Sequence, residues 1–181
     1  MIPASRSVAL LLALLALPSP GLAHRLDEYL QATLVSINPG EVRLRLNLTP
    51  GVEVAEQVIS RIDRNKDGVI SSNEAAVYSR LLKRDLTLRV DQRKVELRIT
   101  GLNLPETTEL RTGLGIIQIE FSATVHPLAP GAHSLTLKNR HLSGISVYLF
   151  NAAQPPPGSV HIISQKRNDN QSTGEIEFRI D

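Results

Sequence analysis

Glu-Val-Arg-Leu-Arg-Leu-Asn-Leu-Thr, residues 41–49, alternates strictly between apolar and polar side chains. Successive side chains of a β-strand point to opposite faces, so this alternation predicts a strand with one buried and one solvated face. The preceding segment 30–37 is apolar and β-branched, and Asn-Pro-Gly at 38–40 is a turn signal. Residues 30–48 are therefore expected to form a β-hairpin.

Strand patterns return after residue 85 and continue to residue 180. Residues 86–90 and 95–99 predict the two arms of a hairpin, with the turn at 91–94. The mainly apolar run 145–150 predicts a strand that is covered on both faces. Further strands are expected at 117–121, 135–137, 160–164 and 176–180. Short strands at this spacing predict a mainly β domain with an antiparallel β-sandwich-like fold.

Two amphipathic helices are predicted between these strand regions. Residues 52–62 and 72–85 repeat apolar side chains with the period of a helix. Ser72 is the expected N-cap of the second helix, with Glu74 close behind it. Residues 51–85 are thus predicted to form a helix–loop–helix insertion in the β domain.

The segment that joins the two helices has the residue pattern of a single EF-hand calcium loop. Ca²⁺ takes several oxygen ligands, which a 12-residue loop supplies from positions 1, 3, 5, 7, 9 and 12, with glycine at position 6 for the sharp bend. Gly68 fills position 6, and Ile70 at position 8 is the apolar residue that normally anchors such a loop to a neighbouring short strand. The predicted metal ligands are Asp63, Asn65, Asp67, Val69 through its carbonyl, Ser71 and Glu74.

A simple turn and a magnesium loop both fit residues 63–74 less well. A turn needs only two or three Asp, Asn or Gly residues, and it does not require Glu74 at this spacing. Mg²⁺ prefers octahedral geometry and keeps its waters, so Ca²⁺ is the expected cofactor. Arg64 and Lys66 oppose the cation, and no second loop is found to pair with this one. The expected affinity is therefore weak, roughly 10⁻⁴ to 10⁻³ M as in extracellular modules.

The calcium is expected to be structural. A sensor loop opens a Met-rich groove when it binds calcium, whereas this chain has 1 Met, the initiator. A regulatory switch is the alternative role, but the chain lacks the methionines that would form such a groove. The ion is predicted to fix the angle between the two helices.

The N-terminus has the order of a secretory signal peptide, residues 1–23. Arg6 precedes an apolar run at 8–17, which helix breakers and Gly-Leu-Ala at 21–23 follow. The run is shorter than the ~20 residues of a spanning helix, and an uncleaved signal anchor is the alternative. Cleavage after Ala23 predicts an exported protein, periplasmic or secreted, with residues 24–181 as one β-rich domain. No later stretch is apolar enough to cross a bilayer.

Composition argues against several classes of function. The chain has 20 Lys and Arg against 18 Asp and Glu, whereas a nucleic-acid partner requires a concentrated basic face. Cys is 0, so a thiol nucleophile is absent. The sequence also lacks a nucleophile elbow, a phosphate loop and a dinucleotide fingerprint. These patterns predict a protein that is not an enzyme.

His24 has a separate metal-binding hypothesis. The five histidines include no close ligand pair such as His-x-x-x-His. Cleavage after Ala23 would make His24 the first residue, where its amine and imidazole together can chelate Cu²⁺ or Ni²⁺. Transition-metal binding or handling (Cu, Ni or Co) through His24 is therefore the alternative function.

These segments resemble a bacterial group of proteins. The resemblance rests on an Ala-His start at 23–24, the loop insertion, Leu-Thr-Leu-Arg-Val-Asp at 86–91 and Asn-Arg-His at 139–141. The chain resembles the extracytoplasmic β-domains that precede the membrane helices of some nickel/cobalt transporters of the urease- and hydrogenase-accessory type. The chain also resembles stand-alone exported EF-hand domain-containing proteins. The resemblance implies association with a metal transporter, but not transport itself, because no membrane segment follows residue 23. We expect a calcium-binding interaction module for another protein or an envelope component.

Overall fold

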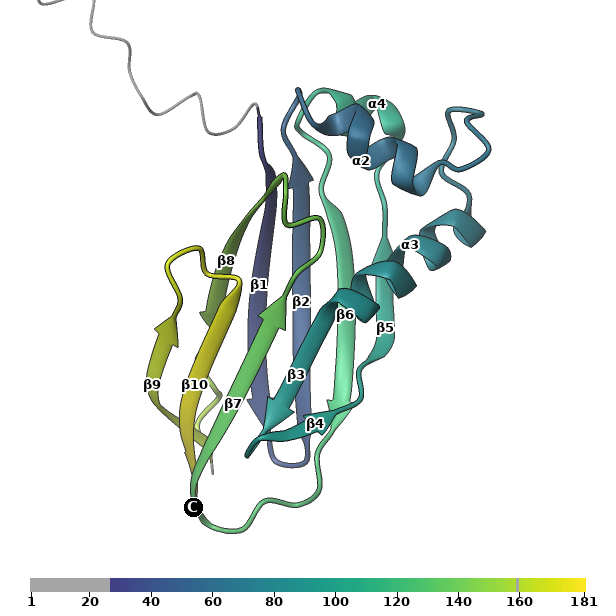
Figure 1. Cartoon of the computed structure of the whole chain (residues 1–181). Helices are drawn as coiled ribbons and strands as arrows, with labels where there is room; N and C mark the ends of the chain where they lie inside the picture. The colour runs from purple at the N-terminus through teal and green to yellow at the C-terminus, as the bar shows by residue number, and fades with distance from the viewer. Residues whose placement is uncertain (1–26, 159) are drawn as a thin grey trace, which may run out of the picture.

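The computed structural model describes residues 27–158 and 160–181, which form a mainly β structure with two five-stranded sheets (Figure 1). The strand order is β5-β6-β2-β1-β8 in the first sheet and β4-β3-β7-β10-β9 in the second. The strands of the first sheet are β1 (Tyr29–Asn38), β2 (Glu41–Pro50), β5 (Arg98–Asn103), β6 (Ile117–Thr124) and β8 (Ser146–Ala152). Those of the second sheet are β3 (Leu86–Val90), β4 (Arg93–Val95), β7 (Gly131–Asn139), β9 (Val160–Arg167) and β10 (Thr173–Ile180).

The predicted hairpin of residues 30–48 is confirmed by β1 and β2. Val35 lies opposite Leu44, and Leu34 lies opposite Arg45. The alternation of residues 41–49 therefore places leucines in the core and arginines on the outer face of the first sheet. Gly40 closes the turn with φ 78°, a conformation that favours glycine.

One hydrophobic core lies between the two sheets and contains side chains from both. The two sheets approach each other closely at Gly174 in β10, where Phe150 of β8 lies over the backbone. A Cβ atom at position 174 would lie 2.2 Å from Cδ1 of Phe150, so only glycine leaves room for the ring. This contact fixes the spacing of β8 and β10 within the core.

β8 pairs with β1 in parallel and has no further strand beside it in the first sheet. Side chains occupy its outer edge instead. The Phe150 N–H donates to Oε1 of Gln171 at 3.3 Å, and the Ala152 N–H donates to Oε1 of Gln165 at 2.6 Å. Nε of Arg167 donates to the Phe150 carbonyl at 2.6 Å. Three backbone groups that an added strand would use, the N–H groups of Phe150 and Ala152 and the Phe150 carbonyl, are thus already bonded.

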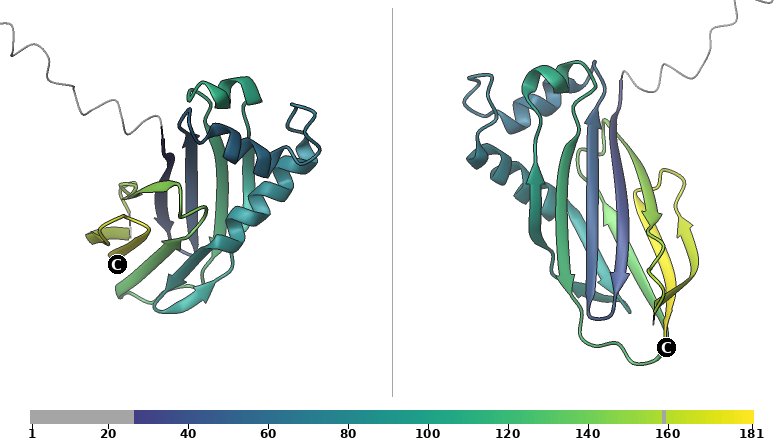
Figure 2. Two further views of the ribbon diagram at one scale, coloured as in Figure 1. Left: turned by 45° about the horizontal axis from the view of Figure 1, so that its top comes forward. Right: turned by 180° about the vertical axis from the view of Figure 1, so that it is seen from behind.

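The helices of the described residues are α2 (Ala55–Ile62), α3 (Ser72–Asp85) and α4 (Thr107–Arg111). Figure 1 shows α2 and α4 at one end of the sheets, and α3 running from that end directly into β3. Figure 2 shows that the helices leave the outer face of the first sheet, formed by β6, β2 and β1, uncovered. None of these helices is long and apolar enough to span a membrane. The loop 63–71 joins α2 to α3 at the end of the sheets where α2 lies.

The second predicted hairpin is only half formed. Arg93–Val95 pairs with β3 as expected, but Arg98–Asn103 pairs with β6 in the other sheet. The chain crosses between the sheets at Leu97, which is buried. Val95, Leu97 and Ile99 alternate without a break, so the pattern predicted strand but gave no sign of the change of partner.

The predicted burial of both faces of residues 145–150 was wrong. Leu149 is 41% exposed, because β8 is an edge strand whose outer face lies on the uncovered side of the first sheet. Val147 and Leu149 lie beside Leu30 and Ala32 of β1 on this outer face. The helix α4 also went unpredicted, because its five residues are too few to establish a helical period.

Candidate metal centre

The loop 63–71 is flanked by two helices: α2 ends where the loop starts, and α3 begins where it finishes. α2 ends at Ile62, and the Asp63 N–H donates to the Ile59 carbonyl at 2.8 Å. α3 begins with Ser71 as its N-cap, so the prediction of Ser72 was wrong by one residue. Ser71 and Glu74 form a capping box, for which the Ser-x-x-Glu spacing is the sequence signal.

Asp63 is buried at the start of the loop, and the loop backbone wraps around its carboxylate. Its Oδ1 accepts from the Lys66 N–H at 2.7 Å, and its Oδ2 accepts from the Gly68 N–H at 2.9 Å. Lys66 and Gly68 have φ of 61° and 85°, in the left-handed region. Gly68 adopts this conformation without steric penalty, which explains the glycine at the sixth loop position.

Glu74 reaches back from α3 to the start of the loop. Its Oε1 accepts from the N–H groups of Arg64 at 2.8 Å and Asn65 at 3.3 Å. Its Oε2 accepts from the Ser71 N–H at 3.0 Å and the Ser71 hydroxyl at 2.7 Å. These hydrogen bonds, above all those from Ser71, lower the pKa of Glu74 to about 2. Glu74 is therefore ionised at neutral pH although it is only 7% exposed.

Asn65 and Asp67 lie on the exposed side of the loop. Oδ1 of Asn65 accepts from the Asp67 N–H at 3.0 Å, and Oδ1 of Asp67 accepts from the Val69 N–H at 2.8 Å. Nδ2 of Asn65 donates to Oδ2 of Asp67 at 2.8 Å. The structure thus places Asn65 beside Asp67, and Ser71 beside Glu74, as two separate pairs. Within residues 27–158 and 160–181, no three histidine or acidic side chains are grouped so that they could hold a metal ion by themselves.

The donor chemistry of the loop fits a hard cation. The six predicted donors are all oxygens, which suit Ca²⁺ rather than a soft or imidazole-preferring metal. An ionised carboxylate has about four acceptor sites, and Glu74 already accepts four hydrogen bonds whereas Asp63 accepts two. A cation at Glu74 has to compete with these donors, which agrees with a weak site.

The second metal hypothesis, at His24, lies outside the described residues. The remaining histidines each lie in a different part of the molecule. His161 is half exposed on β9, where its Nε2 lies 2.7 Å from Oδ2 of Asp181. His126 lies on the exposed connection between β6 and β7. His133 and His141 each contact an aspartate.

A buried polar network joins α3 to the first sheet, and the sequence patterns did not predict it. Nδ1 of His141 lies 2.8 Å from Oδ2 of Asp85, and Nε2 lies 3.0 Å from the Tyr78 hydroxyl. The Tyr78 hydroxyl in turn lies 2.7 Å from that of Tyr29. We call Asp85, His141, Tyr78 and Tyr29 the tyrosine–histidine chain. His141 is 2% exposed, and both tyrosines are fully buried.

The backbone around His141 is held by a ring of amide side chains. Nε2 of Gln31 donates to the His141 carbonyl at 2.8 Å, and Nδ2 of Asn139 donates to Oε1 of Gln31 at 2.8 Å. The His141 N–H completes the ring by donating to Oδ1 of Asn139 at 2.9 Å. The sequence contained a signal for this ring, because Gln31 occupies an inward position of an alternating strand.

The hydrogen bonds of the tyrosine–histidine chain run in one direction. Asp85 has only acceptors, so Nδ1 of His141 carries the hydrogen, and a neutral ring then accepts from Tyr78 at Nε2. Tyr78 accepts from Tyr29 in the same direction. A second proton on His141 would reverse this order. Burial lowers the pKa of His141, although the contact with Asp85 opposes that shift, and burial raises the pKa of both tyrosines.

His133 on β7 forms a different contact. Its Nδ1 lies 2.8 Å from Oδ2 of Asp91 in the β3–β4 turn, and its Nε2 lies 2.7 Å from the Ala129 carbonyl. A carbonyl only accepts, so both ring nitrogens donate when His133 is protonated. The bond to Ala129, and next that to Asp91, raise the pKa of His133. His133 thus ties the β6–β7 connection to the β3–β4 turn.

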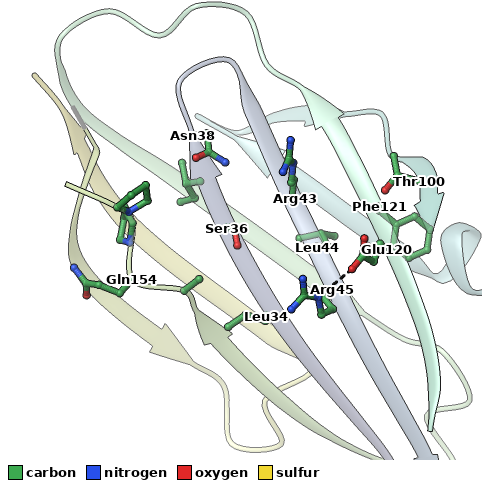
Figure 3. Close-up of a pocket in the computed structure, with 14 residues that line it drawn as sticks. Leu34, Ser36, Asn38, Arg43, Leu44, Arg45, Thr100, Glu120, Phe121 and Gln154 are labelled. Atoms are coloured by element: carbon green, nitrogen blue, oxygen red, sulfur yellow. Dashed lines mark hydrogen bonds and ion pairs between the residues drawn. The ribbon is translucent and has the colours of Figure 1, made fainter. Parts of the chain in front are cut away.

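A hollow of about 300 Å³ lies on the outer face of the first sheet (Figure 3). Arg43 and Arg45 of β2 line it, across from the segment of Gln154. Arg43 pairs with Glu41 at 2.8 Å, and Arg45 pairs with Glu120 at 3.0 Å. Since both arginines have acidic partners, the hollow offers no uncompensated charge for an anionic ligand.

Comparison with models of known protein families finds no match to the chain, and comparison with curated protein sequences finds none either.

Proposed function

We propose that the loop from Asp63 to Glu74 is a single EF-hand that binds one calcium ion. The observation that carries this proposal is the position of Glu74, the last residue of the loop pattern. Its carboxylate is bonded to the N–H groups of Arg64 and Asn65, next to Asp63 at the first position. A turn between two helices does not require an acidic side chain to fold back across the whole loop.

The residues that would hold the ion are those of the sequence pattern. They are Asp63, Asn65, Asp67, the Val69 carbonyl, Ser71 and Glu74. Calcium would supply a positive charge among carboxylates that are otherwise in contact only with N–H and O–H groups. Two of these, Asp63 and Glu74, are nearly buried, so a cation would offset their desolvation.

The role of the calcium is proposed to be structural. The ligands come from the end of α2, the loop and the start of α3, so a bound ion links both helices. α3 continues into β3 and carries Tyr78 and Asp85 of the tyrosine–histidine chain. Binding of calcium would therefore stabilise the junction between the helices and the sheets.

We further propose that the protein is an exported, non-enzymatic module that binds another protein or an envelope component. The His141–Asp85 pair resembles part of a catalytic relay, but His141 is 2% exposed, and its other nitrogen faces the buried Tyr78. A substrate has no access to this pair. The uncovered face of the first sheet, with half-buried leucines on β1, supplies surface for a partner.

The test is thermal unfolding in calcium and in chelator. At a few millimolar calcium we expect a stabilisation of about 1–2 kcal/mol, which raises Tm by roughly 3–6 °C for a chain of this length. Glu74→Gln should remove the calcium-dependent part. Glu175→Gln, on the exposed face of β10, is the matched control and should retain it. A Tm that is independent of calcium in the unmodified protein, together with no binding by calorimetry, would overturn the proposal.

A further inference from the structure

The loop contacts a segment that no calcium-binding pattern assigns. Loops of this kind normally occur in pairs, in which the apolar residue at position 8 anchors each loop to its neighbour. Ile70 occupies that position here, and it packs against the core together with Leu104. Residues 68–70 and 104–108 line one cavity of about 310 Å³. The segment 104–108, which leads from β5 into α4, thus faces the loop across this cavity.

Thr107 makes a direct bond to the loop backbone. Its side chain is nearly buried, at 5% exposure, and its Oγ1 donates to the Gly68 carbonyl at 2.7 Å. The N–H of the same peptide unit belongs to Val69 and donates to Oδ1 of Asp67 at 2.8 Å. Because a peptide unit is planar, bonds at both of its ends fix its orientation. The next carbonyl along the chain is that of Val69, the predicted backbone ligand.

The helix that carries Thr107 is itself held in place. Leu110 is fully buried, and Arg111 forms an ion pair with Glu56 of α2. The chain folds back tightly after α4, where the Gly115 N–H donates to the Glu109 carbonyl at 2.9 Å. Thr107 is therefore a fixed point, independent of α3, against which the loop is positioned.

We propose that Leu104 and Thr107 take the place of the second loop of a calcium-binding pair, and that Thr107 is a positioning residue that sets the calcium affinity of the loop. This inference rests on the proposed function. It predicts that a single copy of the chain binds calcium without a partner loop. The hydroxyl of Thr107 holds the Gly68–Val69 peptide in the orientation that the Val69 carbonyl needs, before any ion arrives.

The first arm of the test needs no metal. Hydrogen exchange of the amides at residues 67–71 is measured in chelator for Thr107→Val, Thr107→Ser and Thr108→Val. Loss of one hydrogen bond should speed exchange of the Val69 amide, which donates to Asp67, roughly threefold to tenfold in Thr107→Val. Thr107→Ser keeps the hydroxyl and should restore slow exchange. Thr108 is the matched control, because it is exposed and lies 3.4 Å from Glu106 rather than on the loop. Unchanged exchange in Thr107→Val would overturn the inference whatever the loop binds.

The second arm measures calcium binding by calorimetry at two protein concentrations that differ tenfold. We expect Thr107→Val to raise Kd about threefold to tenfold, with rescue by Thr107→Ser and no change in Thr108→Val. Kd should not depend on protein concentration, and the protein should remain a monomer in calcium. A Kd that falls with protein concentration, with dimers formed in calcium, would mean that a second copy supplies the partner loop, and the inference would be wrong. If the unmodified protein binds no calcium, the proposed function fails, and the affinity role of Thr107 fails with it.

Discussion

Two histidine–aspartate pairs in this molecule have the same contact distance but opposite shifts of the histidine pKa. The distance from Nδ1 to the Asp Oδ2 is 2.8 Å both for His141 with Asp85 and for His133 with Asp91. The pKa of His141 is lowered and that of His133 is raised. The aspartate contact therefore does not decide the charge of the ring.

The difference comes from burial and from the group at the second nitrogen. His141 lies in the core and faces the Tyr78 hydroxyl, which can donate to a neutral ring. His133 lies near the surface and faces the Ala129 carbonyl, which can only accept. A histidine–aspartate pair thus has to be interpreted together with the partner of its other nitrogen, because that partner selects the neutral or the charged ring.

The largest effect is expected from His141→Gln. The substitution removes the partner of the buried Tyr78 hydroxyl and of Asp85, whose side chain is 25% exposed, which should lower the free energy of unfolding by about 2–4 kcal/mol. Urea unfolding at pH 7 measures this change. His161→Gln, at a surface pair that is 56% exposed on both sides, is the control and should change it by less than about 0.5 kcal/mol. Equal effects of the two substitutions would remove the distinction between buried and exposed pairs.

The next largest effect is expected from removal of the tyrosine hydroxyls, and it should be larger for Tyr78 than for Tyr29. Tyr78→Phe leaves Nε2 of His141 and the Tyr29 hydroxyl without a hydrogen-bond partner and should cost about 1–3 kcal/mol. Tyr29→Phe removes only the first donor of the chain and should cost less, about 1 kcal/mol. The same urea experiment tests the order. A larger loss in Tyr29→Phe would contradict the direction assigned to the hydrogen bonds.

His133→Gln should have a smaller effect, because the pair is only partly shielded from solvent. We expect a loss of about 1 kcal/mol at pH 6, where the charged ring donates at both nitrogens. The loss should be smaller at pH 8.5 than at pH 6, because the stabilisation is lost as the pH rises through the folded pKa of His133, which lies above its usual value. Denaturant unfolding at the two pH values provides the measurement, and a loss that grows with pH would show that the ring is neutral.

The smallest expected effect is on how the free energy of unfolding of the unmodified protein depends on pH, to which the two histidines contribute with opposite signs. His141 has a folded pKa below its usual 6.5, so the unfolded state binds more protons, and stability should fall as the pH drops below about 6.5. His133 has a folded pKa above 6.5, so its contribution is complete below that pH and is lost as the pH rises through the folded pKa. His133→Gln should remove only the loss of stability that occurs as the pH rises. His141→Gln should remove only the part of the loss at acid pH that is due to the histidine. Each slope is expected to be below about 1 kcal/mol per pH unit.

The local patterns predicted most strands because a strand with one buried face records that face in its alternation. Residues 41–49 are the clearest example. The pattern does not record which sheet a strand joins, and so the departure of Arg98–Asn103 to the first sheet was not foreseen. The run 145–150 was misinterpreted for a related reason. In the sequence, an apolar face that is exposed looks the same as an apolar face that another layer covers.

The loop 63–74 and the tyrosine–histidine chain differ in how far the sequence could foresee them. The residues proposed to bind calcium lie within one segment of fixed spacing, so their pattern is readable. The partners of His141 are 56 and 63 positions away in the chain, which no local period connects. Asn-Arg-His at 139–141 stood out as distinctive, but its role depends on Gln31 and Tyr78, which only the fold brings near.

The bonded outer edge of β8 also limits self-association of the protein. An open strand edge can pair with an edge of another molecule, and repeated pairing leads to fibrils. Gln165, Gln171 and Arg167 cap the backbone groups of Phe150 and Ala152 with side chains of the same molecule. Each copy thus occupies part of this edge with its own side chains, so an added strand would have to displace them before it could pair with β8.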